Sequence, residues 1–313
     1  MNDVPQGSCP NVTSQSDDDG LADIASRLRL IRTVSQQRRY KGRPTPKLPS
    51  KVAIDQIVED AVALMYPRHF GPDTLTPETT DAFVSGMLAS LRPRLAEQIR
   101  LELLLSDPAE EADCAAQARA IALDFLRGLV RLRDLHDTDI AAAFDSDPSA
   151  RSLDEIVFCF PGVAAILRHR LAHAVFVLGA PMLARIIAEL SHSRTAIDIH
   201  PGAQIGPAFF IDHGTGVVIG ETAIIGRNVR LYQNVTLGAK RFEADASGSL
   251  IKGRPRHPII GDDVVIYAGA TVLGRITVGK GSVIGGGVWL TRDVAAGSVV
   301  TQASAQMQSG GTA

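Results

Sequence analysis

Between Ile197 and Leu290 an apolar residue returns at every sixth position, usually with a small or branched residue four positions further on. Six residues match neither the period of an α-helix nor that of a β-strand. The register changes by two residues after Ile211 and resumes at Ile219. The in-phase positions are Ile199, Ile205, Ile211, Ile219, Ile225, Leu231, Leu237, Ile260, Ile266, Val272, Val278, Ile284 and Leu290. The pattern predicts a parallel β-helix, in which each hexad forms one side of a triangular coil and stacked coils bury the apolar column.

Before residue 193 the apolar positions follow the 3.6-residue period of α-helices instead. Thr76 followed by Pro77 is typical of a helix start, with a side-chain cap and a proline at the first helical position. The predicted helices cover about residues 21–39, 51–66, 77–105, 110–135, 152–160 and 162–191. The sequence therefore predicts an α+β protein, with an all-α part preceding the β-helix.

Four segments follow from this change of period. Residues 1–20 are rich in Ser, Asp and Asn and predict a disordered tail, because they offer little apolar surface to bury. Residues 21–192 form the predicted helical domain, in which residues 21–50 are a helix and a proline-rich linker. Residues 193–301 form the predicted β-helix, and residues 302–313 form a flexible tail.

Composition narrows the classes of function. The formal net charge of −2 gives no bulk attraction to nucleic acid or to an anionic membrane, so neither is an expected partner. The three cysteines have no CxxC spacing, which argues against a disulfide framework and a zinc ribbon, and Cys159 in an apolar run predicts a core position. No secretory signal and no confident membrane span are visible, so we expect a cytoplasmic protein.

Both interruptions of the six-residue repeat carry a histidine. The two-residue shift contains His213, and the loop of about residues 239–257, which does not fit the repeat, ends at His257. Function in solenoids tends to lie where the repeat is interrupted. An imidazole is suited to removing a proton near neutral pH, and a carboxylate on its other nitrogen stabilises the imidazolium. Asp198 is a candidate for that carboxylate beside His213.

Five segments in order resemble one enzyme family. They are Asp198-Ile-His-Pro, Ile211-Asp-His-Gly-Thr-Gly, Ile219-Gly-Glu-Thr-Ala, Asn234-Val-Thr-Leu-Gly and Arg256-His-Pro. Together they resemble the serine O-acetyltransferases, which are hexapeptide-repeat acyltransferases with a left-handed β-helix. The resemblance implies that acetyl-CoA and L-serine react to give O-acetylserine, a precursor of cysteine, and that no metal takes part.

The resemblance also implies roles for single residues. His213 is the general base that takes the proton of the serine hydroxyl, and Asp198 orients it. Arg256 and His257 hold the serine carboxylate, and His257 is also counted with the catalytic group. A zwitterionic substrate needs opposite charges at its two ends, which agrees with this division.

Three further carboxylates complete the expected substrate site. By the same resemblance Asp147 and Asp212 receive the serine ammonium group, and Glu221 completes the polar pocket. CoA is expected along the solenoid wall, where small residues let the pantetheine arm approach the backbone. The residues implied for CoA are Gly238, Ala268 and Gly286.

The resemblance implies a homotrimer or a dimer of trimers, with active sites near the contacts between copies. The chain lacks the terminal isoleucine through which many relatives dock to cysteine synthase, so that docking is not expected. Three other functions stay open. They are a related acyltransferase for a sugar or another amino acid, a γ-carbonic-anhydrase-like zinc protein using His200, His213 and His257, and a scaffold without catalysis.

Overall fold

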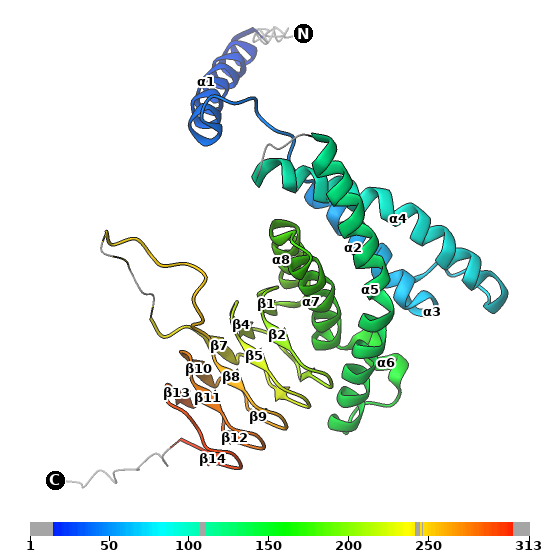
Figure 1. The fold of residues 1–313 in the computed structure, drawn as a ribbon, viewed down its shortest axis with the longest axis vertical. Helices are drawn as coiled ribbons and strands as arrows, with labels where there is room; N and C mark the ends of the chain where they lie inside the picture. Colours follow the sequence, from blue (N-terminus) through cyan, green and yellow to red (C-terminus); the bar gives the residue numbers. More distant parts are fainter. Residues whose placement is uncertain (1–14, 107–110, 242–244, 246, 303–313) are drawn as a thin grey trace, which may run out of the picture. The chain divides into compact units, whose positions relative to one another are not determined.

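Figure 1 shows the computed structural model, which describes residues 15–106, 111–241, 245 and 247–302. It contains two compact units, residues 1–47 and 48–313. The first unit holds helix α1 (Gln15–Tyr40), which begins before the predicted start at residue 21. Residues 1–14 of the expected N-terminal tail, and residues 303–313 of the expected C-terminal tail, lie outside the described residues.

The second unit begins with helices at most of the predicted places. They are α2 (Lys51–Met65), α3 (Pro67–Phe70), α4 (Pro77–Ser106), α5 (Glu111–Ser146), α6 (Leu153–Cys159), α7 (Pro161–Val177) and α8 (Pro181–Thr195). The side chains of Ser50 and Ser152 accept hydrogen bonds from the backbone N–H groups of Ala53 and Glu155, which caps α2 and α6.

The helices of the second unit differ from the prediction in three ways. The short helix α3 was not predicted, and α5 extends to Ser146 instead of about Leu135. The single stretch predicted over residues 162–191 is wrong, because the structure divides it into α7 and α8. Gly179, with φ of +95°, and Pro181 separate the two, since the first leaves helical geometry and the second lacks the N–H that would continue the helix.

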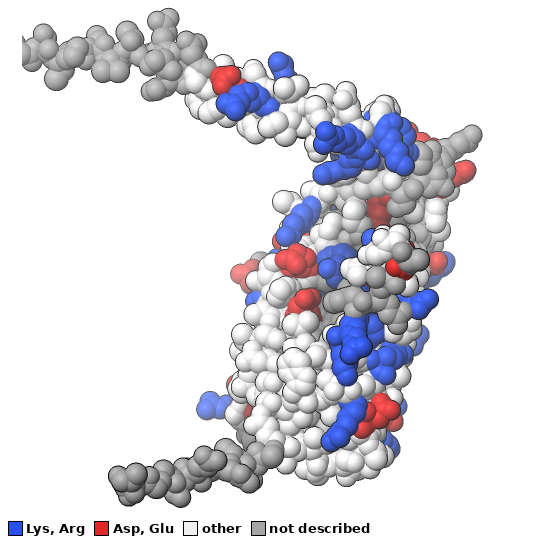
Figure 2. Space-filling model, turned by 90° about the vertical axis from the view of Figure 1, so that its left-hand side faces the viewer, with Lys and Arg blue, Asp and Glu red and all other residues white. Residues whose placement is uncertain are grey.

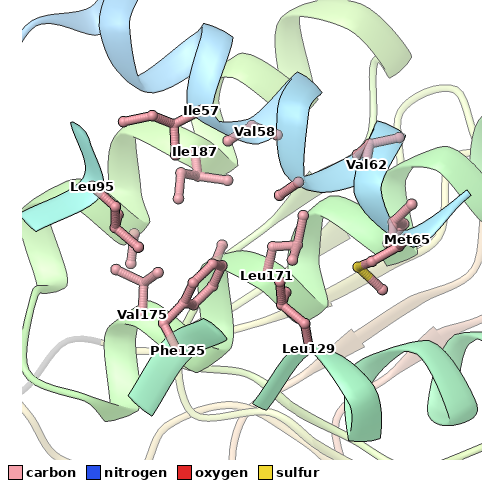
Figure 3. Packing of buried hydrophobic residues seen from close by; sticks show 14 of the residues in the cluster. Ile57, Val58, Val62, Met65, Leu95, Phe125, Leu129, Leu171, Val175 and Ile187 are labelled. Atoms are coloured by element: carbon pink, nitrogen blue, oxygen red, sulfur yellow. The ribbon is translucent and has the colours of Figure 1, made fainter. Parts of the chain in front are cut away.

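The helices surround an apolar core, part of which is shown in Figure 3. Val58 of α2, Phe125 of α5, Leu171 of α7 and Ile187 of α8 point toward one another there, and each is at most 3% exposed. Cys159 is exposed and does not lie in this core, so that prediction is wrong. The buried positions of the seven-residue α6 are Ile156 and Val157, which leaves Cys159 on the other side of the helix.

Fourteen short strands of the described chain form a three-sided parallel β-helix after α8. They are β1 (Asp198–Ile199), β2 (Gln204–Ile205), β3 (Phe210–Ile211), β4 (Val218–Ile219), β5 (Ile224–Ile225), β6 (Arg230–Leu231), β7 (Thr236–Gly238), β8 (Ile259–Ile260), β9 (Val265–Ile266), β10 (Thr271–Leu273), β11 (Thr277–Val278), β12 (Val283–Ile284), β13 (Trp289–Leu290) and β14 (Val299–Val300). Sheet A has the order β1-β4-β7-β10-β13, sheet B β11-β8-β5-β2 and sheet C β14-β12-β9-β6-β3. Every pairing is parallel, which confirms the predicted solenoid (Figure 1).

The six-residue repeat is the reason for this fold. Ile199 pairs with Ile219, and Ile219 with Leu237, so the apolar residues of successive coils lie above one another. Each is at most 4% exposed. The chain passes from sheet C to sheet A along one edge of the prism and from sheet A to sheet B along another. We name these the C–A edge and the A–B edge.

A buried ion pair connects the helical part to the first coil. The guanidinium of Arg170 on α7 donates to both oxygens of Asp139 on α5, at 2.6 and 2.7 Å. Arg170 also donates to the carbonyls of Ile205 and Gly206, and Asp139 accepts from the N–H of Phe209. Asp139 is 0% and Arg170 3% exposed at the side chain. This network fixes the solenoid on the helices that precede it.

None of the described helices is long and apolar enough to cross a membrane.

Candidate functional site

His213 lies on the C–A edge, where two additional residues interrupt the six-residue repeat. His213 and Gly214 both have positive φ, +56° and +88°, so the chain bulges at this corner before β4 begins. The side chain of His213 is 73% exposed, and its Nδ1 lies 3.8 Å from Oδ1 of Asp212, whose side chain is 20% exposed. That distance is too long for a hydrogen bond but short enough for electrostatic attraction.

Asp147 lies near the same corner. It follows α5, and its carboxylate accepts hydrogen bonds from the N–H and the hydroxyl of Ser149, at 2.8 and 2.7 Å. These bonds are the main reason why the pKa of Asp147 is below its ordinary value, and the charge of His213 contributes as well. Asp147, Asp212 and His213 therefore lie close enough together for His213 to influence both carboxylates electrostatically.

Asp198 is on the same edge, one coil below. It pairs with Val218 in sheet A, and the coil of His213 rests on its neighbour, because a Cβ on Gly214 would meet the side chain of Ile197 at 2.4 Å. Between the described side chains of Asp198 and His213, however, there is neither a hydrogen bond nor an ion pair. The orienting role of Asp198 stays a prediction.

The A–B edge carries His257, which is 6% exposed. Its Nδ1 accepts a hydrogen bond from the N–H of Thr222 at 3.0 Å and lies 2.9 Å from the Thr222 hydroxyl. A backbone N–H only donates, so Nδ1 must be unprotonated and the neutral ring carries its proton on Nε2. Burial, followed by the charge of Arg256, lowers the pKa of His257 to about 4. The ring therefore stays neutral at physiological pH and presents an N–H donor at Nε2.

Arg256 is held beside that ring. Its guanidinium donates to the carboxylate of Glu221 at 2.6 Å, and both side chains are 29% exposed. Burial alone would raise the pKa of Glu221, but the hydrogen bond from Arg256 and nearby positive charge bring it below its ordinary value. Arg256 and His257 thus form a fixed group of donors, supported by a carboxylate.

Two further residues of this group were not among the predicted site residues. The Thr222 hydroxyl accepts from the backbone N–H groups of Arg256 and His257, at 2.9 and 3.1 Å. Arg275 donates to the carbonyls of Thr222 and His257, at 2.6 and 3.0 Å. These hydrogen bonds hold the end of the loop of about residues 239–257 against the solenoid. The Gly-Glu-Thr segment contained Thr222, but only the fold shows that Arg275 lies two coils beyond Thr222 and one coil beyond His257.

Gly220 makes room for the His257 ring. A Cβ at Gly220 would lie 2.0 Å from Cδ2 and 2.1 Å from Nε2 of His257, so any side chain would displace the imidazole. His200 lies near this edge too, and its Nδ1 accepts from the N–H of Gly202 at 2.9 Å, a bond within its own turn. His200 and His257 are thus on the A–B edge and His213 is on the C–A edge, so these three histidines do not converge.

The residues expected to bind CoA fall on both edges. Ala268 and Gly286 are neighbours on the C–A edge, where a Cβ at Gly286 would lie 3.2 Å from the carbonyl oxygen of Ala268. Gly238 ends β7 and pairs with Leu273 on the far side of sheet A. The structure therefore places the expected site in two halves, one on each edge of sheet A.

Known proteins similar to this chain share one activity. A serine acetyltransferase from Synechococcus elongatus is 54% identical over 301 residues, which cover 93% of this chain and 94% of that protein. The chain belongs to the serine acetyltransferase family. The serine acetyltransferase of Bacillus subtilis is 51% identical over 156 residues, which cover 50% of this chain and 68% of the relative.

Solved structures of the serine acetyltransferase family have the same fold. Serine acetyltransferase 1 of Entamoeba histolytica, in complex with L-cysteine, matches 78% of this chain and 86% of its own with a TM-score of 0.69 and 36% identity. The soybean enzyme complexed with serine matches 81% of this chain and 98% of its own, with a TM-score of 0.51 and 30% identity. Residues 257–292 match the family model "Bacterial transferase hexapeptide (six repeats)". The solenoid is the left-handed β-helix of these acyltransferases, as predicted.

The low pKa of His257 gives a prediction about stability. In the unfolded chain a histidine is protonated below about pH 6.5, whereas in the folded protein His257 stays neutral down to about pH 4. The unfolded state then binds the extra proton, so the free energy of unfolding falls as the pH is lowered from about 6.5 toward 4. We expect His257 to contribute a slope of up to about 1.4 kcal/mol per pH unit in that window.

The variant His257→Asn isolates this contribution. Its amide oxygen can accept a hydrogen bond from Thr222 but does not bind a proton in this pH range. The free energy of unfolding of the variant should therefore change less steeply with pH than that of the wild type, by the slope that corresponds to about one proton. His136 and His169, whose pKa values burial also lowers, contribute equally to both proteins. Urea unfolding at fixed protein concentration between pH 5 and 7 measures the slopes. Equal slopes would show that folding does not lower the pKa of His257.

Proposed function

We propose that this protein transfers the acetyl group of acetyl-CoA to the hydroxyl oxygen of L-serine and so makes O-acetylserine and CoA. The observation that carries the proposal is the 54% identity to a serine acetyltransferase over nearly the full length of both chains. The side chains on the two edges of sheet A are also of the kinds that a zwitterionic amino acid and an alcohol proton require.

The C–A edge supplies the base. His213 takes the proton of the serine hydroxyl while the hydroxyl oxygen attacks the carbonyl carbon of the thioester. As the C–O bond forms and the C–S bond breaks, the CoA thiolate leaves and receives that proton from the imidazolium. Asp212, 3.8 Å from Nδ1, stabilises the positive ring during this interval. Asp198, on the adjacent coil, orients the ring once the substrate has closed the site.

The two ends of serine are held by opposite charges. Arg256, kept in place by Glu221, and the Nε2–H of His257 donate to the serine carboxylate. Asp212 and Asp147 accept from the ammonium group at the C–A edge. A neutral His257 suits this role, because it donates a hydrogen bond without competing for the proton that His213 removes.

One chain alone does not complete this arrangement. The C–A and A–B edges are separated by one six-residue side of the prism, roughly 20 Å at 3.3 Å per residue. Serine is far smaller than that. We infer that the C–A edge of one copy faces the A–B edge of the next, which in a closed head-to-tail ring gives a homotrimer with three sites. A dimer of such trimers, and a cytoplasmic location, stay predictions.

The release of CoA from acetyl-CoA tests the function directly. We expect release that depends on L-serine, with O-acetylserine identified by mass. Homoserine should react slowly because its hydroxyl lies one methylene further from the carboxylate and ammonium groups. Amino sugars should react slowly because they have no carboxylate for Arg256 and His257 to hold. Preference for a sugar would contradict the proposal, and CoA release without any acceptor would indicate a hydrolase.

A further inference from the structure

The chain has one tryptophan, Trp289, and its ring lies on the surface. Trp289 is 70% exposed, although Val288 and Leu290 on either side of it are each 5% exposed. It stands on β13, the last strand of sheet A, where it pairs with Thr271. A large exposed aromatic ring costs free energy in water, and such rings concentrate where proteins bind ligands.

Trp289 belongs to the same edge of the solenoid as His213. Backbone hydrogen bonds stack Asp212, Tyr232 and Tyr267 on successive coils of the C–A edge. The rings of Tyr232 and Tyr267 are stacked as well, with centroids 5.0 Å apart and planes inclined by 9°. The next coil turns at Gly286 and leads directly into Trp289. Two stacked tyrosines and Trp289 therefore lie along the coils that follow His213.

The length of this edge fits the donor substrate. Trp289 lies three coils beyond β4, the strand after His213, which is roughly 14 Å at the spacing of neighbouring strands. The pantetheine arm of CoA has twelve bonds between its sulfur and its phosphate, as many as four residues of extended chain, and spans roughly 13–14 Å. With the thioester at His213, the phosphates and the adenine reach the level of Trp289.

A groove of about 410 Å³ lies beside the ring. It is lined by residues of β13 and of the coil after it, including Thr291, Arg292, Thr301 and Gln302. The Gln302 amide donates to the Gly287 carbonyl at 2.6 Å and closes one end. Arg292 and Trp289 line the same groove, and a guanidinium together with a flat aromatic ring suits a purine that carries phosphate. On the side of the solenoid shown in Figure 2, Lys and Arg side chains gather next to uncharged surface.

We propose that Trp289 is the platform on which the adenine of CoA stacks, and that Arg292, which lines the same groove, binds a CoA phosphate. The inference rests on the proposed function, which makes acetyl-CoA the donor. It assigns a binding role to a residue outside the five segments that resemble the family. The role concerns affinity for the donor and not the chemical step, because the ring lies far from His213.

Emission from the single tryptophan reports on this contact without an activity assay. Titration with CoA, or with adenosine 3′,5′-bisphosphate, should quench the emission of Trp289, whereas pantetheine alone should leave it unchanged. In kinetics, Trp289→Ala should raise the KM for acetyl-CoA about ten-fold, the range expected for loss of base stacking. The kcat and the KM for L-serine should stay within two-fold, and Trp289→Phe should recover most of the affinity.

Val299→Ala is the matched control, because Val299 is also 70% exposed at the same end of the solenoid but belongs to sheet C. Its kinetics should equal those of the wild type. Quenching by pantetheine as strong as that by CoA would overturn the proposal, as would unchanged emission in an enzyme that acetylates serine. A smaller assembly for Trp289→Ala in light scattering would show a contact between copies instead. Quenching by CoA without acetylation of serine would leave the platform intact and refute the proposed function.

Discussion

Replacing His213 by alanine should lower kcat for acetylation of L-serine by a factor of about 10²–10⁴, the usual contribution of a general base. The ring is 73% exposed in the chain, and the carboxylate of Asp212 lies 3.8 Å from its Nδ1. Its removal therefore takes away little packing, and the unfolding temperature should hardly change. The KM for acetyl-CoA should also stay within a few-fold, because the proposed CoA site lies along the coils beyond His213. Initial rates of CoA release measure both constants.

His192→Ala provides the control for this variant. His192 is another partly exposed histidine, on α8, with a carboxylate of Glu189 at 3.8 Å. It has no place in the proposed site, so its rates should match the wild type. If His213→Ala kept more than a tenth of the wild-type kcat, another group would have to take the serine proton.

Replacing Asp139 by alanine should have the largest effect on stability. The substitution leaves the guanidinium of Arg170 buried, at 3% exposure, without its charged partner. It also removes the acceptor for the N–H of Phe209 in the first coil. Breaking a buried ion pair from one side typically costs about 3–5 kcal/mol. Urea unfolding should show a loss of that size, together with weaker attachment of the solenoid to the helices.

A matched aspartate lies on the same helix. Asp124 of α5 pairs with Arg127 at 3.1 Å, but the two side chains are 53% and 68% exposed. Asp124→Ala should cost less than about 1 kcal/mol, because exposed pairs contribute little. A comparable loss in both variants would mean that the buried network around Asp139 does not hold the first coil in place.

The sequence predicted the solenoid well because its core obeys a simple rule. A coil with three equal sides must return an apolar residue to the interior at a fixed interval, and Ile219, Ile225 and Leu231, each six residues apart, show that interval directly. The helical boundaries were harder. Helix α5 runs on to Ser146 because its later turns pack on the first coil, as Asp139 does, and no local pattern encodes that contact.

The candidate site was predicted as a set of residues but not as an arrangement. His213 and His257 were found because both interrupt the repeat. Their placement on different edges of sheet A can be worked out only by counting hexads along the chain, because the motifs themselves do not say which edge a residue occupies. Arg275 was missed because its partners, the carbonyls of Thr222 and His257, are backbone atoms far from it in sequence.

Mixing two inactive variants tests the central claim that each site needs two copies. His213→Ala damages the C–A edge and Arg256→Ala the A–B edge. Each trimer that contains both variants then has one site with two intact edges, whichever variant is in excess. Co-expressed with different tags and purified through both, such trimers should show about one third of the wild-type activity.

The pair His213→Ala and Asp212→Ala is the control, since both changes damage the same edge and no intact site can form. L-serine-dependent CoA release by the doubly tagged trimers is the deciding measurement. The arrangement proposed here predicts about one third of wild-type activity for the first pair and almost none for the second. Equal inactivity of both pairs, in trimers of confirmed mass, would contradict it and place the whole site within one chain.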